Sequence, residues 1–184
     1  MSTLASARAV LSDAVDRDQL DDAFAQGTWR LINVIEAGPG HPAQLIFARD
    51  AHHHVHVVDD QQLGLTYLAA QGEDGQEAIA ELSDSLPCYS SASARADLAN
   101  ATPPARARAL GALVLLEPEA PDLESMIIEA LRDPSVTLRV AGLTAAAYAP
   151  RPVFRDHVTA LRDADPEPKL REAAERVIAA LPQP

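Results

Sequence analysis

DPSVTLRVAGL (residues 133–143) and DPEPKLREAAE (residues 165–175) share an Asp-Pro start and a Leu-Arg pair at the same offset, 32 positions apart. An aspartate followed by a proline is typical of a helix start, because the carboxylate accepts unpaired backbone N–H groups and proline fits the first turn. A unit that recurs at a fixed interval of this size predicts a helical repeat array. In such an array each helix pair buries its apolar face by stacking on the next pair.

Apolar residues at helical spacing continue on both sides of these stretches and predict five helices over residues 101–181. Their positions are Ala107, Leu110 and Val114 after Pro103 and Pro104; Leu123, Met126, Ile127, Ala130 and Leu131; Leu138, Ala141, Ala145 and Tyr148; Phe154, Val158 and Leu161; and Leu170, Ala173, Ala174, Val177, Ile178 and Leu181. The rear half is therefore expected to be entirely helical.

The motif Asp-Pro-x-x-x-Leu-Arg-x-Ala, as it stands at residues 133–141, resembles HEAT repeats, in particular the short bacterial kind found in phycobilisome-lyase-like proteins. The resemblance covers about residues 101–181, and its first helix pair lacks the Asp-Pro. It implies a short solenoid that binds another protein or, as in that group, an enzyme or ligand carrier of the phycobilin-lyase-like kind. The repeat motif is structural there, so no catalytic residue carries over.

The arginines near the starts of the second helices allow two interpretations. The resemblance implies that Arg139 and Arg171 turn inward to acidic residues at neighbouring turns and so brace adjacent units. Alternatively, Arg106, Arg108, Arg139 and Arg171 line one ridge that accepts an acidic or phosphorylated ligand. The sequence favours bracing and leaves the ridge open.

The front half has a different pattern, which predicts an α+β fold. Two N-terminal helices are expected, over residues 4–15 and 18–26, the second with Asp18 as N-cap and Gly27 as its end. Residues 28–36, 44–50, 54–60 and 63–72 predict a three- or four-stranded antiparallel β-meander, with a helix over 28–36 as the competing interpretation. A helix carrying Ala78, Ile79, Leu82 and Leu86 would cover one sheet face. We place the small α+β domain at residues 1–92 and the helical repeat domain at 93–184, with the boundary inside the small, polar, proline-bounded segment of residues 88–104.

Four histidines lie within AHHHVHVVDD (residues 51–60). In an extended strand His52, His54 and His56 share one face, while His53, Val55 and Val57 share the other. Histidines spaced in this way can chelate zinc or another divalent metal. They can equally decorate an exposed face without any ligand, and the sequence favours that interpretation, with no cofactor. The metal site remains the alternative.

The net charge of −12 is concentrated in residues 1–100, which carry five arginines against fifteen aspartates and glutamates. Such a surface repels phosphate backbones and attracts basic proteins, so nucleic acid is disfavoured as a partner. We expect an acidic patch that docks on a basic protein surface, formed by Asp59, Asp60, Glu73, Asp74, Glu77 and Glu81. The simpler interpretation is that the charge only keeps the protein in solution.

The remaining features of the sequence exclude several kinds of segment and site. The N-terminus has no apolar run for a signal core or membrane span, which favours a cytoplasmic protein. One lysine among fifteen basic residues indicates a GC-rich, bacterial source. Cys88 is the only cysteine, which excludes an internal disulfide, and none of the common catalytic motifs occurs.

The sequence favours a non-catalytic protein-binding module of adaptor, inhibitor or immunity type. A phycobilin-lyase-like enzyme or carrier and a histidine-based metal-binding regulator are the alternatives.

Overall fold

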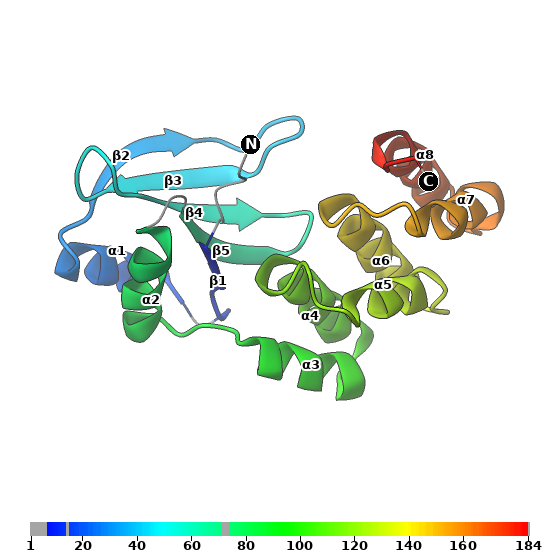
Figure 1. Cartoon of the computed structure of the whole chain (residues 1–184), viewed down its shortest axis with the longest axis horizontal. Coiled ribbons are helices and arrows are strands. Elements are labelled where there is room, and N and C mark those ends of the chain that lie inside the picture. Colours follow the sequence, from blue (N-terminus) through cyan, green and yellow to red (C-terminus); the bar gives the residue numbers. More distant parts are fainter. Residues whose placement is uncertain (1–6, 14, 71–73, 184) are drawn as a thin grey trace. The chain divides into compact units, whose positions relative to one another are not determined.

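The computed structural model describes residues 7–13, 15–70 and 74–183, and these contain eight helices and five strands. The chain is a mixed α+β protein, as predicted. It divides into two compact units, unit 1 (Met1–Ser90) and unit 2 (Ser91–Pro184). Strands belong to unit 1, whereas unit 2 is helical throughout its described length (Figure 1).

Unit 1 is built on an antiparallel sheet with the strand order β1-β5-β4-β3-β2. Its strands are β1 (Ala7–Val10), β2 (Arg30–Ile35), β3 (Ala43–Ala48), β4 (His54–Asp60) and β5 (Leu65–Ala70). The four strands β2 to β5 are consecutive neighbours, so the predicted meander is confirmed and the helix interpretation of residues 28–36 is wrong. β1 adds a fifth strand beside β5, with Ala7 opposite Ala70 and Val10 opposite Tyr67.

The first predicted N-terminal helix is wrong, because its described part contains β1 instead. Ala7 and Ala9 are both buried on one face of this strand while Arg8 between them is exposed, which is the alternation of a strand. The apolar spacing of these residues also fits a helix, but backbone pairing with β5 makes them a strand. Leu4 and Ala14, which belonged to that prediction, lie outside the described residues.

The second N-terminal helix is confirmed as α1 (Arg17–Gln26), which ends at Gly27 as predicted. Its N-cap is Asp16 rather than Asp18. The Asp16 carboxylate accepts the Gln19 backbone N–H at 2.9 Å, and the Gln19 side chain accepts the Asp16 N–H at 3.0 Å. This reciprocal capping box satisfies two N–H groups at once and fixes the first turn.

The core of unit 1 lies between one sheet face and the helices α1 and α2 (Gly75–Ser85). Phe24 of α1 stacks on Phe47 of β3 with ring centroids 3.8 Å apart. Ile79 and Leu82 of α2 belong to the same buried cluster, and α2 packs against β1, β4 and β5 (Figure 1). The predicted covering helix is therefore confirmed.

The end of unit 1 returns to the start of the sheet. The Tyr89 N–H donates to the Val10 carbonyl at 2.8 Å, and the Ser12 N–H donates to the Pro87 carbonyl at 2.9 Å. Cys88 lies in this returning segment, in a bridge with Leu11, and its side chain is exposed. The backbone of residues 87–89 is thus held while its single thiol faces solvent.

Unit 2 consists of three successive helix pairs. They are α3 (Ser91–Asn100) with α4 (Pro103–Leu116), α5 (Leu123–Leu131) with α6 (Val136–Tyr148), and α7 (Phe154–Ala164) with α8 (Pro168–Ala180). The second helices pack in order, α4 on α6 and α6 on α8, and α5 packs on α7. All five helices predicted for residues 101–181 are present. None of the helices in the described residues is long and apolar enough to cross a membrane.

The polar segment in which we expected the boundary contains α3, so a boundary after residue 92 falls inside a helix, and the two units divide after Ser90. Only Ala94 of α3 is buried, and its apolar residues form no stripe, which is why periodicity missed it. Its alanine-rich sequence has high intrinsic helix propensity, and packing against α4 supplies the remaining stabilisation of α3.

α5 and α6 approach each other closely at Gly142. A Cβ atom at this position would lie 2.7 Å from the Leu131 backbone nitrogen and 3.0 Å from the Ala130 carbonyl carbon. Both distances are too short for ordinary packing. Glycine therefore allows the middle of α6 to cross the end of α5 at backbone contact.

Candidate interaction surfaces

The turns between helices in unit 2 are held by arginine–aspartate contacts. Arg139 donates to Asp165 through Nε at 2.7 Å and through Nη2 at 3.1 Å, and the two side chains are only 12 % and 2 % exposed. Because the guanidinium donates to both carboxylate oxygens, it holds the pKa of Asp165 below its usual value. This pair joins α6 to the turn before α8.

A similar arginine–aspartate pair occurs one helix pair earlier, and one pair later an arginine holds the backbone of the turn. Arg106 Nη1 lies 3.5 Å from Asp133 Oδ2, and Arg171 Nη1 donates to the Asp165 backbone carbonyl at 2.6 Å. Asp133 and Asp165 also accept the backbone N–H two residues on, at 2.8 and 2.9 Å. The helices α6 and α8 begin three residues after these aspartates, later than the sequence predicts.

These contacts support the bracing interpretation of the arginines. Arg106, Arg139 and Arg171 direct their guanidinium groups to the turns, where they contact carboxylates or backbone carbonyls. Arg108 is half-buried on α4. A ridge that binds an acidic or phosphorylated ligand would have to break these contacts first, and it stays a prediction.

The predicted acidic residues have different surroundings, and their role as a docking patch stays a prediction. Asp60 is 1 % exposed and accepts the backbone N–H groups of Gln62 and Leu63, so it stabilises the β4–β5 turn. Asp74 and Glu81 contact basic partners of unit 1, as described below. Asp59 and Glu77 are exposed, and Glu73 lies outside the described residues.

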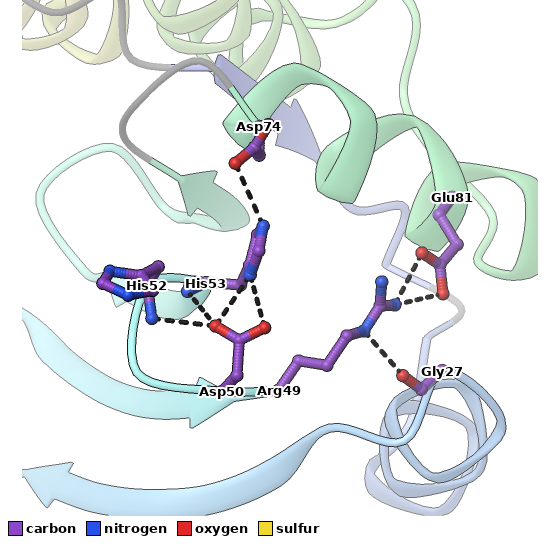
Figure 2. Close-up of polar contacts among 7 residues, drawn as sticks. All are labelled: Gly27, Arg49, Asp50, His52, His53, Asp74 and Glu81. Carbon is purple, nitrogen blue, oxygen red and sulfur yellow. Dashed lines mark hydrogen bonds and ion pairs between the residues drawn. The ribbon is translucent and has the colours of Figure 1, made fainter.

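Arg49, at the end of β3, connects three elements of unit 1 (Figure 2). Its Nη2 donates to both Glu81 carboxylate oxygens at 2.5 and 2.6 Å, and its Nε donates to the Gly27 carbonyl at 3.0 Å. The guanidinium also lies 4.4 Å from the centroid of the Trp29 ring, within range of a cation–π interaction. Glu81 therefore serves packing within unit 1 rather than an open acidic surface.

His53 lies between two carboxylates in the same region (Figure 2). Its Nδ1 is 2.7 Å from Asp50 Oδ2, and its Nε2 is 3.1 Å from Asp74 Oδ2. The hydrogen bond to Asp50 raises the pKa of His53, with a smaller contribution from Asp74. Asp50 also accepts the backbone N–H groups of His52 and His53. The bond from His52, followed by the contact with the His53 ring, lowers the pKa of Asp50 to about 2. The β3–β4 loop is thereby tied to the start of α2.

The four histidines do not share one strand, because β4 begins at His54 and leaves His52 and His53 in the preceding loop. Val55 and Val57 face the core as predicted, at 0 % and 4 % exposure. His56 Nδ1 lies 2.9 Å from the Gln44 side-chain oxygen, and desolvation lowers its pKa. Within residues 7–13, 15–70 and 74–183 no group of three His, Cys, Asp or Glu side chains is suited to a metal ion. The metal site at His52, His54 and His56 stays a prediction.

Two exposed apolar surfaces escape the sequence analysis. On β2, Leu31, Ile32 and Val34 are 44 %, 56 % and 55 % exposed, although the run reads as an ordinary apolar strand. On α6, Val136, Val140 and Tyr148 are 43 %, 46 % and 36 % exposed. The signal for the second surface was present: Val136 and Val140 are four residues apart and share one side of α6, whereas buried Leu138 lies on the opposite side.

No family model, no curated protein and no solved structure matches this chain.

Proposed function

We propose that this chain is a non-catalytic protein-binding module of adaptor, inhibitor or immunity type, in which unit 2 acts as a short HEAT-like solenoid. The three helix pairs and their ordered packing, α4 on α6 and α6 on α8, support a solenoid rather than a closed bundle. Solenoids of this kind bind partners along the faces that stacking leaves open.

The observation that carries the proposal is the apolar stripe on α6. Arginine–aspartate contacts hold the turn before this helix and the turn before α8, yet α6 presents Val136, Val140 and Tyr148 to solvent. Exposed apolar side chains gathered on one helix of a braced scaffold are typical of an interface for another protein. The solenoid provides rigidity, and the stripe provides the contact.

The acidic front half supports a partner with a basic surface. Unit 1 carries four arginines against fourteen aspartates and glutamates. Long-range attraction of this kind increases association rates and weakens as salt screens it. We therefore expect the association rate to fall as ionic strength rises, while dissociation changes less.

A photo-crosslinking amino acid at Val140, in the full chain expressed in its source cells, tests the proposal. The matched control places the same group at Glu129, which is exposed on α5, the other helix of the pair. We expect one partner protein to be captured from Val140, not from Glu129, and to be lost when Val136→Glu is added. Equal capture from both positions, or no capture from Val140, would contradict the proposal.

A further inference from the structure

β2 is the last strand of the sheet and pairs only with β3 within the described residues. Edge strands of soluble proteins are usually protected by charged side chains, by proline or by a covering element. Between Arg30 and Glu36 this strand carries no charged residue, and its apolar side chains are about half exposed. A bulge between Leu31 and Asn33 interrupts the register, which restricts the strands that can pair with this edge.

A groove lies directly beside this edge on the helix-bearing face of the sheet. It is a cavity of about 360 Å³ whose apolar part is formed by Leu20 of α1 together with Val34, Leu45 and Val57. Glu36 and Asp59 also line it, and none of its lining residues is basic. We call the exposed residues of β2 and this cavity the β2 groove. It offers apolar contact flanked by negative charge.

The backbone of β2 has a donor that a partner strand can use. The Val34 N–H donates to the side-chain oxygen of its neighbour Asn33 at 2.9 Å. A carbonyl of an incoming strand can replace this local bond at little net cost, because one hydrogen bond is exchanged for another. The Asn33 side chain therefore satisfies the Val34 N–H as long as no partner strand is bound.

The negative charge of unit 1 indicates which kind of partner fits the β2 groove. A second copy of the chain would bring another unit with ten more acidic than basic residues against the same edge, and like charges would repel. A basic segment would instead be attracted to Glu36 and Asp59 while its apolar side chains fill the groove. Addition of an extended peptide to an exposed sheet edge is an established mode of recognition, with main-chain bonds for affinity and pockets for specificity.

We infer that the β2 groove docks an extended segment of another protein in which basic residues alternate with apolar ones. The segment adds to the sheet as a strand beside β2. This inference rests on the proposed function, since it gives the acidic unit a contact site of its own, separate from α6.

The probe is a random peptide library displayed on phage and selected on the immobilised full chain, followed by fluorescence anisotropy with the enriched peptides in labelled form. We expect the enriched peptides to alternate apolar residues with Arg or Lys. Val34→Lys should weaken their binding about tenfold or more, because it removes an apolar contact and places a positive charge on the edge. Val34 is exposed, so circular dichroism should show an unchanged fold.

Two further variants make the result specific. Glu36→Lys should weaken the same peptides by charge reversal without altering the apolar contact. Glu129→Lys, the same charge reversal at an exposed position of α5, should leave peptide binding unchanged. The two proposals fail independently, because loss of crosslinking at α6 would not affect this assay. Enrichment of acidic or uncharged peptides, no enrichment, or binding insensitive to Val34→Lys would overturn the inference. Light scattering that shows a dimer dissociated by Val34→Lys would also overturn it, because a second copy would then be the occupant.

Discussion

Replacing Asp165 by asparagine tests how strongly the arginine–aspartate contacts hold the helix pairs of unit 2 together. The substitution keeps the size of the side chain and removes its charge, which leaves the nearly buried Arg139 guanidinium without its ion-pair partner. Removing one partner of a buried pair costs about 3–5 kcal/mol. Arg139 retains bonds to the carbonyls of Asp133 and Pro134, so we expect the lower value, about 3 kcal/mol.

The measurement is urea unfolding followed by two signals. Far-ultraviolet circular dichroism reports the helices, most of which lie in unit 2, and fluorescence reports Trp29, the only tryptophan, which is buried in unit 1. We expect Asp165→Asn to lower the circular dichroism midpoint and the free energy of unfolding. A loss of about 3 kcal/mol in a unit of this size corresponds to a fall in Tm of about 12 °C or more.

The matched control is Asp163→Asn, two residues away. Asp163 pairs with Arg162, but the two side chains are 57 % and 36 % exposed, so solvent screens the pair and the loss should be much smaller than for Asp165→Asn. If the two variants lose equal stability, or if Asp165→Asn loses less than about 1 kcal/mol, the contact does not brace the array and the arginines become available for a ligand.

Three further predictions concern other contacts. Because the pKa of His53 is raised on folding, its contribution to stability is complete below its unfolded value of about 6.5 and is lost as pH rises through the higher folded value. His53→Gln should therefore lower the midpoint of Trp29 fluorescence in urea at mildly acidic pH and have less effect at alkaline pH; a loss independent of pH would contradict this. Gly142→Ala should destabilise unit 2 by about 1–3 kcal/mol despite the better helix propensity of alanine, because the added methyl meets the α5 backbone; a gain in thermal stability would show that the helices separate easily. Asp16→Ala removes the α1 cap and should cost about 1 kcal/mol in urea unfolding; no change would mean that tertiary packing alone sets the start of α1.

The parts of the fold that follow from the sequence are those with a strong period. The helices of unit 2 carry apolar residues at steps of three and four, and the strands from Arg30 to Ala70 alternate with turns, so both patterns predicted the elements correctly. β1 and α3 could not be predicted in this way. β1 depends on pairing with β5, far along the chain, and α3 buries a single alanine.

The candidate surfaces depend even more on tertiary structure. Acidic residues close in sequence, such as Asp59 and Asp60, have opposite surroundings, because one is exposed and the other accepts N–H groups in a turn. The histidine pattern assumed a strand that starts before His52, whereas hydrogen bonds to Asp50 hold that residue in a loop. Exposure of the β2 edge follows from the strand order alone. Local sequence does not encode which strand ends a sheet.

The free thiol of Cys88, which faces solvent beside Leu11, makes the unmodified chain directly addressable by maleimide chemistry. A dye or spin probe attached there would sit near the end of unit 1 without any cysteine having to be added or removed. The native protein therefore carries its own reporter position for recording partner binding in real time.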